Sequence, residues 1–377
     1  MKVLLVGDSP GALAAVRELG RAGWTPGVAS PSRLGYAATS RWNRRWHYVP
    51  PLVQNPGHFV TAVEEIVGRF GYELAFGVGD AEVLQLSANR RRLGAIVPYV
   101  PHQQVRRAFD KLELTDVARA AGLSTPDTQI ANLQSVSNFD LPVVVKARLH
   151  WDPEVPRQAD RVRAVVAHSK QDALDAADRM RAIGAEPVFQ EYSHGRVLHV
   201  VVVTGTDHQI LTAAAHLTTR LGSSETGQSA RAVTVPLASE LRGGVQAFLR
   251  AIGWFGLADL QFWLSDDNEA RLTDFNGRIY GGLALPYASG MRPIDTWARL
   301  ATGRDVEVVS PRIGVCYQAM EGDLRNALQQ SGLRSTMMVA DAFYHSFFSV
   351  HPIWSWSDPR PGLTYLARLP SRVRGRV

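Results

Sequence analysis

Two segments near residue 260 carry oxygen-bearing side chains at alternate positions. Asp259 and Gln261 fall two residues apart in the first, and Asp274 and Asn276 do so in the second. Alternate residues of a strand share a face, so Gln261, Asp274 and Asn276 can converge if the segments pair as a hairpin. Such oxygens suit Mg²⁺, which takes one or two carboxylates and completes its shell with phosphate and water. Arg278 would lie beside that site, where a guanidinium can hold a transferred phosphoryl group.

Two lysines stand where a positive charge is costly without a partner. Lys146 ends the apolar segment 141–146, and Lys111 follows Asp110 at the start of a predicted helix. A buried ammonium needs a negative partner, and a nucleotide phosphate is one, because lysine offers a compact charge with three donors. The alternative is that each side chain snorkels to solvent. Taken singly, each lysine leaves both interpretations open.

A third polar group is Gln190-Glu191-Tyr192, which ends a strand-like segment shortly before Gly195. A carboxylate at a strand end can accept hydrogen bonds from an adenine amino group or from ribose hydroxyls. An exposed glutamate on a hairpin explains the same residues equally well.

The bulk composition describes an ordinary globular chain. It has 377 residues, 45% of them hydrophobic and 20% charged, which suffices for two or three packed units. No run of eighteen apolar residues exists, so we expect no membrane span. The apolar start is broken too early, at Gly7, for a signal peptide. The single cysteine, Cys316, allows neither an internal disulfide nor a cysteine metal cluster and fits a reducing cytoplasm.

The net charge of +6 comes mostly from clustered arginines. The clusters lie at 41–45, 90–92, 106–107 and 368–376. They could be solvated surface, or they could attract a nucleotide, an acidic substrate or a membrane surface. Nucleic acid is not expected, because no recognition motif with interleaved aromatics and glycines is present.

Hydrophobic periodicity predicts the elements that position these residues. Residues 3–29 predict a strand, a glycine turn, a helix and a second strand. This is a Rossmann-like half without the full G-x-G-x-x-G spacing. Further helices are predicted at 59–70, 108–121, 173–183 and 237–252, and strands at 74–78, 141–146, 187–192, 198–204, 209–215, 258–264 and 270–275. Residues 150–162 and 222–227 read as polar connections. Aromatics crowd 343–354, and we expect a helix that packs on the body by its aromatic face. A substrate or membrane surface is the alternative.

Together, the motifs resemble a known superfamily. They run in the order Asp110-Lys111, Ala121-Gly122-Leu123, Thr125-Pro126, Val144-Val145-Lys146, Gln190-Glu191-Tyr192, Gly195, Gly256-Leu257-Ala258, Gln261 and Asp274-Phe275-Asn276-Gly277-Arg278, with Ser40-Arg41 and Gly79-Asp80 before them. This order over residues 1–305 resembles the ATP-grasp superfamily. It is most similar to the predicted carboxylate–amine ligases that include D-aspartate ligase and relatives of the large carbamoyl-phosphate synthase subunit.

The resemblance implies an α/β (α+β) fold with a defined domain order. Residues 1–105 would form a Rossmann-like pre-ATP-grasp domain. Residues 106–305 would form a two-lobed ATP-grasp domain, with the small lobe and hinge in 106–195. Residues 306–377 would be a helical, aromatic extension with a basic tail.

The resemblance also implies an activity and a role for each motif. The activity is ATP- and Mg²⁺-dependent ligation of a carboxylate to an amine or a thiol through an acyl phosphate, with Mn²⁺ as an alternative ion. The substrates would be small molecules, and a homodimer is common among proteins that resemble this one. The arginine clusters of the first domain favour an acidic substrate, and the single cysteine fits a cytoplasmic location. The ATP phosphates would be contacted by Lys111 and Lys146, and the adenine pocket would be lined by Gln190, Glu191 and Tyr192. The metal would be held by Gln261, Asp274 and Asn276. The catalytic residues would be Arg278 and Lys146, and the substrate would be faced by Arg220 with 222–227.

Two alternatives stay open. The superfamily's last motif usually reads Glu-Ile-Asn-Pro-Arg, whereas here Asp274 is one methylene shorter and Gly277 replaces proline. Gln261 replaces a common glutamate. These departures are compatible with a catalytically degenerate nucleotide-binding regulatory or scaffold protein. The strand–turn–helix at the start suggests the second alternative, a Rossmann-type oxidoreductase binding NAD(P) at 7–11.

Overall fold

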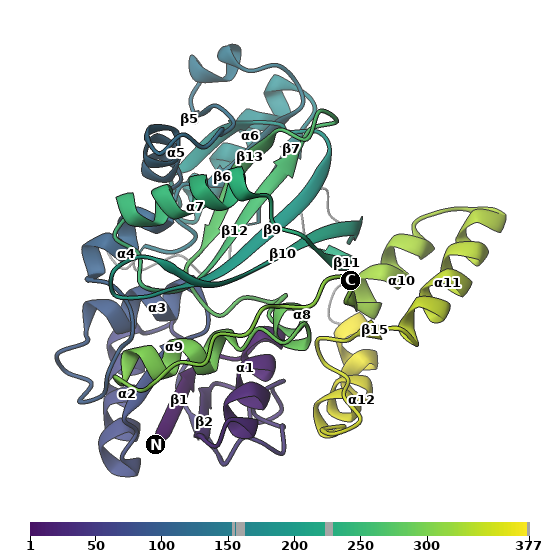
Figure 1. Cartoon of the computed structure of the whole chain (residues 1–377). Helices are drawn as coiled ribbons and strands as arrows, with labels where there is room; N and C mark the ends of the chain where they lie inside the picture. The colour runs from purple at the N-terminus through teal and green to yellow at the C-terminus, as the bar shows by residue number, and fades with distance from the viewer. Residues whose placement is uncertain (153–154, 156–162, 223–228, 375–377) are drawn as a thin grey trace.

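The computed structural model describes residues 1–152, 155, 163–222 and 229–374, with side chains through residue 368. Figure 1 shows a seven-stranded sheet at the centre, a parallel sheet below it, a smaller sheet above it and a helical extension to one side. None of the helices in these residues is long and apolar enough to cross a bilayer.

The first unit is a four-stranded sheet in the order β3-β2-β1-β4, in which every pair is parallel. Its helix α1 begins where the Ser9 hydroxyl accepts a hydrogen bond from the Ala12 amide at 3.1 Å, an N-cap that satisfies one free donor. The predicted strand–turn–helix–strand order is confirmed. The bounds are β1 Lys2–Val6, α1 Pro10–Arg21, β2 Thr25–Ser30, β3 Arg45–Tyr48, α2 Pro56–Phe70, β4 Leu74–Gly77 and α3 Asp80–Ala88.

Two helices, not the one predicted over 108–121, lead out of this unit. Helix α4 spans His102–Phe109 and helix α5 spans Lys111–Ala120. Asp110 separates them, because its extended backbone ends the first helix while its side chain accepts from the Leu112 and Glu113 amides of the second. The break places Lys111 at the first position of α5.

The small sheet has the order β5-β8-β6-β7 and is antiparallel throughout. Helix α6 packs against it over a separate apolar core. The bounds are β5 Thr128–Ile130, a 3₁₀ turn Ser135–Asn138, β6 Val143–Ala147, β7 Val165–Ala167, α6 Lys170–Ala182 and β8 Pro187–Glu191. Most of the connection predicted at 150–162 lies outside the described residues, as does nearly all of 222–227.

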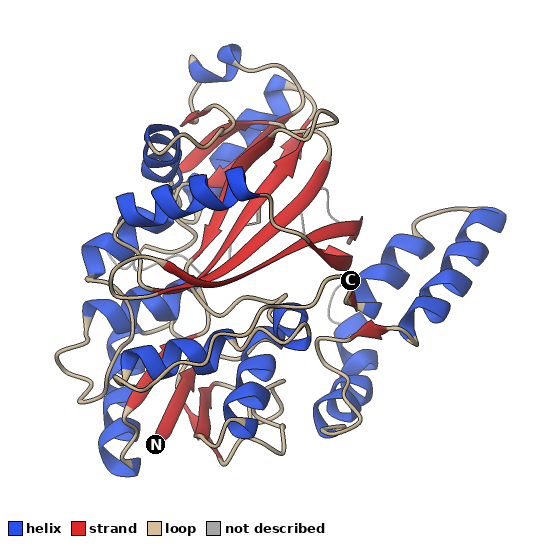
Figure 2. Ribbon diagram, viewed as in Figure 1, coloured by secondary structure: helices blue, strands red, loops and turns tan. Residues whose placement is uncertain are grey.

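The large sheet has the order β13-β12-β9-β10-β11-β14-β15 and forms the middle of the molecule (Figure 2). The hairpin predicted from 258–264 and 270–275 is confirmed as β12 and β13. Helix α7 crosses this sheet in Figure 1, and α8 and α9 contact α1 of the first unit. The bounds are β9 Arg196–Thr204, β10 Ile210–Leu221, β11 Ser229–Val235, α7 Ser239–Ala251, β12 Gly256–Leu264, β13 Ala270–Asn276, α8 Ala284–Ala288 and α9 Pro293–Ala301.

The chain after residue 305 adds to the large sheet and then projects from it. Strands β14 Cys316–Gln318 and β15 Ser349–Val350 extend the sheet, and α10 Met320–Leu328, α11 Gly332–Ser346 and α12 Arg360–Arg374 form the projecting part at the right of Figure 1. The expectation that the aromatic helix packs on the body by its aromatic face is wrong. Phe343, Tyr344, Phe347 and Phe348 are all exposed, and Ala342 is the buried residue of α11.

Candidate active site

The polar residues of the β12–β13 hairpin lie on one face of the large sheet. Gln261 is directly opposite Asp274, and Asp259 is directly opposite Asn276. Directly opposed residues of an antiparallel pair share a face. The Asn276 amide donates from Nδ2 to Asp259 Oδ2 at 3.1 Å. The convergence that alternation predicts is therefore present, and it includes Asp259, which is fully buried.

Both predicted lysines reach this hairpin from other elements. Lys111, from α5, forms an ion pair through Nζ with Asp274 Oδ1. Lys146, from β6 of the small sheet, donates from Nζ to the Thr273 carbonyl at 2.8 Å. Both side chains are buried, so the snorkelling alternative is wrong for both.

Burial and the neighbouring charges shift the pKa values of Lys146 and Asp274. Burial lowers the pKa of Lys146 from 10.5 to about 7, against the attraction of Asp274 and with a further lowering by Lys111. Burial would raise the pKa of Asp274, but the charges of Lys111 and Lys146 outweigh burial and hold that pKa well below its usual range. Asp274 is consequently ionised at neutral pH, whereas Lys146 sits near its titration midpoint.

Arg278 links the hairpin to the first unit. Its Nε forms an ion pair with Asp80 at the start of α3, and its Nη2 donates to Asn276 Oδ1 at 3.0 Å. His150 Nδ1 lies 2.6 Å from the second Asp80 oxygen. Burial would raise the pKa of Asp80, but Arg278 and His150 overcome it and keep the pKa well below its usual range. The guanidinium is thus held in place from both sides.

The polar network continues into the large sheet. His199 Nδ1, on β9, lies 3.0 Å from Asp259 Oδ1. The His199 ring stacks parallel on His216 of β10, with 4.7 Å between centroids and 5° between planes. Burial, with a smaller effect of His199, lowers the pKa of His216 well below 6.5. A run of polar contacts therefore joins His150 to the histidine pair.

Sequence reasoning did not assign Asp80, His150, His199 or Asp259 to the site. The position of Asp80 did indicate a site, because it follows a strand of an α/β unit, and open sheets bind ligands at such strand ends. The position of Asp259 did so too, because it alternates with Gln261. His199 lies within a valine-rich strand, and nothing local to it indicates which residue it faces.

The residues at the end of β8 make contacts within the protein. Gln190 is buried and donates from Nε2 to Thr128 Oγ1 at 2.9 Å. Both Glu191 oxygens accept from Arg271 of β13, at 2.8 and 2.6 Å. Tyr192 is half-buried, and its ring lies 6.4 Å from the ring of Trp263. Glu191 therefore connects the small sheet to the large one, and an adenine role for these three residues stays a prediction.

The donor set fits Mg²⁺ only together with a phosphate ligand. Within the described residues, no three or more His, Cys, Asp or Glu side chains are grouped to hold a metal ion. Asp274 supplies one ionised carboxylate, Gln261 faces it across the hairpin, and Asn276 Oδ1 also accepts from Arg278. Mg²⁺ is commonly bound by one or two carboxylates with substrate phosphates. The set matches that mode, and it does not match a closed all-protein metal centre.

Gly277 has a packing explanation. A Cβ at this position would overlap the ring of Trp254 and come 2.9 Å from Phe275 Cε1. Trp254 is fully buried. The absence of the superfamily's proline here therefore follows from a large neighbouring side chain and does not by itself indicate lost chemistry.

Other residues of the protein pack closely against the glycine-containing turn at 7–11. A Cβ at Gly11 would overlap the Tyr280 carbonyl, so the backbone after Arg278 lies directly against this turn. Dinucleotide binding requires the pyrophosphate to approach these glycines closely. The packing argues against the oxidoreductase alternative.

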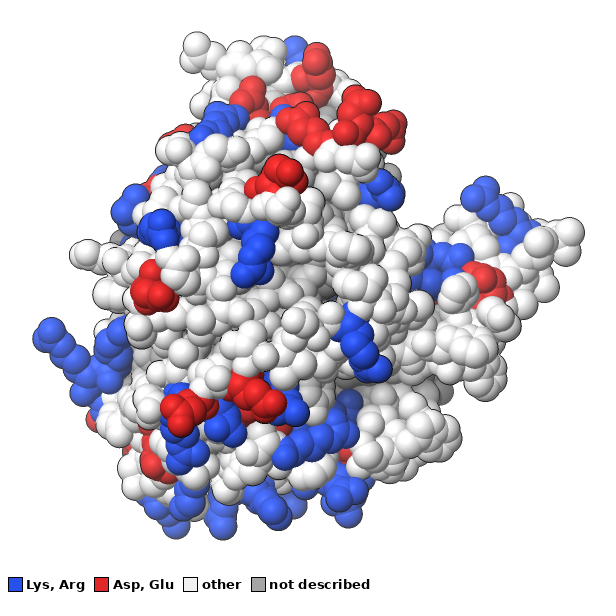
Figure 3. Space-filling view, in the orientation of Figure 1, with Lys and Arg blue, Asp and Glu red and all other residues white. Residues whose placement is uncertain are grey.

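Several predicted anion-attracting arginines are paired within the protein. Arg106 pairs with Asp152, Arg107 with Glu113, and Arg220 with Asp323 and Asp341. Arg220 thus holds the extension. Lys and Arg gather along the lower edge of Figure 3, over the first unit.

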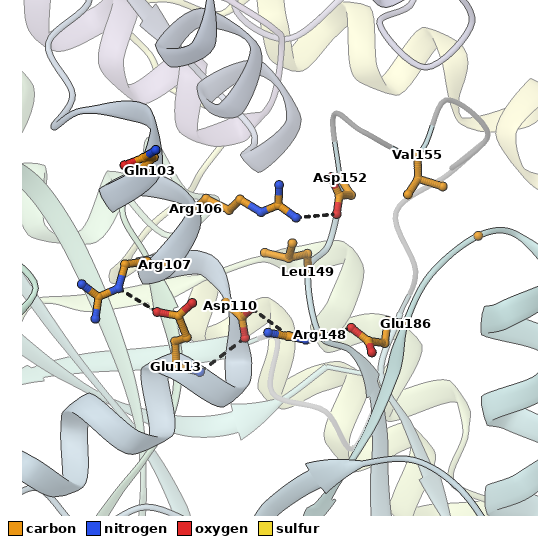
Figure 4. Close-up of a pocket in the computed structure, with 11 residues that line it drawn as sticks. Gln103, Arg106, Arg107, Asp110, Glu113, Arg148, Leu149, Asp152, Val155 and Glu186 are labelled. Carbon is orange, nitrogen blue, oxygen red and sulfur yellow. Dashed lines mark hydrogen bonds and ion pairs between the residues drawn. The ribbon is translucent and has the colours of Figure 1, made fainter.

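A cavity of about 570 Å³ lies beside this site and is distinct from it. Its charged lining residues form ion pairs, among them Arg106–Asp152 and Arg148–Asp110 (Figure 4). Lys146, Gln190 and Asp274 do not line it. The cavity borders the lysine site at Asp110, which caps the helix that presents Lys111, and at Arg148, whose carbonyl accepts from the Lys111 amide at 3.1 Å.

Comparison with known proteins gives structural matches only. No family model matches the chain, and no curated protein matches it by sequence. Among solved structures, an L-amino acid ligase from Bacillus licheniformis is similar with a TM-score of 0.63 and 13% identity, covering 82% of this chain and 75% of that one. The biotin carboxylase domain of 2-oxoglutarate carboxylase from Hydrogenobacter thermophilus, crystallised with MgADP and bicarbonate, has a TM-score of 0.65 and 14% identity over 84% and 73% of the chains. The N5-carboxyaminoimidazole synthetase of Staphylococcus aureus with ADP has a TM-score of 0.62 and 12% identity over 85% and 82%.

The fold of the chain is that of the two-lobed ATP-grasp enzymes, as the resemblance predicted. At such low identity the match establishes the fold alone.

Proposed function

We propose that this protein is an ATP- and Mg²⁺-dependent ligase that joins a carboxylate to an amine through an acyl phosphate. The observation that carries the proposal is the meeting of Lys111, Lys146 and Arg278 around the Asp274–Asn276 segment. These side chains come from elements far apart in sequence, and one of them crosses between the two lobes. Solved structures of the same fold include an L-amino acid ligase and complexes with ADP or MgADP.

The residues suggest how the first step would be assisted. A carboxylate oxygen would attack the γ-phosphorus, the bond to the β-phosphate oxygen would break, and ADP would leave. Negative charge shifts toward the oxygens of the transferred group and of ADP, and preformed positive groups stabilise that change. Lys111 and Lys146 would hold the phosphates, and Arg278, already fixed by Asp80, would hold the transferred group. Mg²⁺ on Asp274, with Gln261 and Asn276 oxygens near it, would neutralise phosphate charge.

The second step needs positioning more than covalent catalysis. The amine would attack the acyl carbon and lose a proton, and phosphate would leave with the electron pair of the broken C–O bond. Holding both reactants in one site accounts for much of such an acceleration. A thiol acceptor would follow the same sequence, and the test below includes it.

The test is ADP release from purified protein with MgATP and a panel of carboxylic acids paired with amines or thiols. We expect ADP that depends on both substrates, and a fall of at least about 100-fold in Asp274→Asn, because the site loses its carboxylate. The matched control is Asp178→Asn, which makes the same change at an exposed aspartate of α6 and should retain full activity.

The same material separates the degenerate alternative. ATP binding that is indifferent to Mg²⁺ and unchanged in Asp274→Asn, without ADP release for any substrate pair, would contradict ligation. That outcome would support a regulatory or scaffold protein that binds nucleotide.

A further inference from the structure

The extension exposes a long apolar face. On α11, Leu333, Met337, Ala340 and Tyr344 repeat at the spacing of one helical face, and each is exposed. The apolar surface continues beyond the helix end, where Phe347 is 83% exposed. Further exposed apolar residues of the extension are Leu328, Phe343, Phe348, Trp356, Leu363 and Leu366. Single exposed apolar residues are normal, but a concentration of large ones marks an interaction surface.

A position beside the apolar stripe attaches α11 to the body, because Asp341 follows Met337 by four residues, one helical turn. Asp341 accepts from Arg220 and Arg231, at 2.9 and 2.7 Å, and both arginines belong to the large sheet. The fully buried Asp323 of α10 accepts from the same two arginines. The hairpin of α10 and α11 is therefore attached to the body through Asp323 and Asp341, and the apolar stripe beside Asp341 stays exposed.

The charge of the extension is one-sided. From α10 onward the acidic residues are Glu321, Asp323, Asp341 and Asp358, and each is paired with an arginine: Glu321 with Arg325 of α10, and the three aspartates with arginines of the body. The basic residues over the same stretch are Arg325, Arg334, Arg360, Arg368, Arg372, Arg374 and Arg376. In Figure 3 the projecting part is mostly white, with blue at its outer end and blue beside red where it meets the body. The exposed surface thus combines aromatic and aliphatic side chains with arginine and little negative charge.

A second copy of the chain is a poor occupant of this surface. A two-fold interface brings the same patch of both subunits together. Arginines would then face arginines, and the carboxylates that could pair with them, Glu321 among them, are already used inside each subunit. An anionic bilayer has neither problem, because apolar side chains enter the acyl boundary while arginines meet lipid phosphates.

We propose that the extension docks the protein on anionic membrane surfaces, with α11 lying in the interface by the face defined by Leu333, Met337, Tyr344, Phe347 and Phe348. The proposal concerns a surface remote from the lysine site and does not depend on the ligase activity. Trp356, which is 87% exposed, has the residue type that is enriched at membrane–water boundaries.

The test is co-sedimentation of the full-length protein with vesicles. One set is pure phosphatidylcholine and the other contains about 30% phosphatidylglycerol. We expect partition into the anionic vesicles, weaker partition into the neutral ones, and weakening at about 0.5 M salt. Phe347→Ser/Phe348→Ser should reduce partition at least about tenfold, because two aromatic side chains no longer enter the bilayer. Leu133→Ser, at an exposed leucine of the small lobe, is the matched control and should bind like the wild type.

Three results would overturn the proposal. They are no partition of the wild type into anionic vesicles, equal partition into neutral vesicles, and equal partition of the double variant. Analytical ultracentrifugation of the same proteins tests whether a second copy occupies the face. If the wild type is a dimer and the double variant is a monomer, the face belongs to a dimer interface instead. Circular dichroism of each variant confirms that loss of binding is not loss of folding.

Discussion

At the scale of single residues, the two buried lysines of the site depend on the same counter-charge. Among the residues that the structure describes, Lys111 pairs with Asp274, and the same carboxylate attracts Lys146. Two buried ammonium groups with one buried carboxylate leave an excess positive charge, which is favourable only once an anion arrives. The free protein responds by lowering the pKa of Lys146 to about 7.

This arrangement predicts proton uptake on nucleotide binding. Above pH 7 much of Lys146 is neutral in the free protein, and phosphate should restore its charge. At pH 8 we expect uptake approaching one proton per MgATP, measured by calorimetry in buffers of different ionisation enthalpy, and an affinity that falls as pH rises from 7 to 9. Lys146→Arg should bind without uptake, because arginine stays charged throughout. Undiminished uptake in Lys146→Met would assign the proton to another group.

At the scale of elements, helix ends and strand pairs bring the chemistry together. Asp110 splits the predicted helix and so places Lys111 at a helix start. The register of β12 on β13 sets Gln261 against Asp274. A shift of one residue would turn both side chains to the other face.

The contact of α1 with α9 carries an unusual carboxyl group. Glu18 is buried, and its Oε1 accepts from the Ile294 and Asp295 amides at 2.8 Å each. Burial raises its pKa from 4.5 to about 8, and the two amides only partly oppose the effect. The folded protein therefore keeps Glu18 neutral at pH 7.

The pH dependence of stability follows with a definite sign. Because the folded pKa lies above the unfolded one, stability from Glu18 is complete below pH 4.5 and is lost as pH rises through about 8. Glu18→Gln keeps the shape and removes the titration. In urea unfolding at pH 5.5 to 8, the wild type should lose up to about 1.4 kcal/mol per pH unit relative to Glu18→Gln. Glu65→Gln, at an exposed glutamate of α2, should show the wild-type slope, and parallel curves for Glu18→Gln and wild type would refute this assignment.

At the scale of the whole molecule, the extension ties the two ends of the chain together. Asp358 is fully buried against the first unit. It accepts from Arg17 Nε at 3.0 Å, from the Ser40 hydroxyl at 2.6 Å and from the Arg41 amide at 3.0 Å. The motif Ser40-Arg41, which the superfamily resemblance includes, is used here to hold the extension.

Removing one partner of this ion pair should cost more folding stability than removing both partners. Asp358→Ala leaves the buried Arg17 guanidinium without its charge partner, and we expect a loss of about 3–5 kcal/mol. The double change Arg17→Met/Asp358→Leu removes both charges and should recover most of that loss. Chemical unfolding measures both, with limited proteolysis to follow release of the extension. Equal losses in the single and double variants would show that packing, not the charge pair, holds the extension.

The sequence by itself determined what depends on near neighbours. Alternation and turn residues fix the β12–β13 hairpin and so the common face of Gln261, Asp274 and Asn276, and an apolar strand ending in lysine identifies Lys146. The register of a hairpin is local, so its pattern can be read directly. The ATP-grasp architecture was likewise readable, because it is an ordered series of such local motifs.

Only the tertiary structure decided which distant groups meet. Asp80 with Arg278, Glu191 with Arg271, and Arg17 with Asp358 join residues from separate units. No periodicity encodes these pairs, since each depends on how whole elements pack. The exposure of a helix face also depends on tertiary packing. The sequence of an aromatic helix is the same whether its apolar face is buried or exposed to solvent. Here Arg220 and Arg231 hold α11 through Asp341, and the aromatic residues beyond that contact stay exposed.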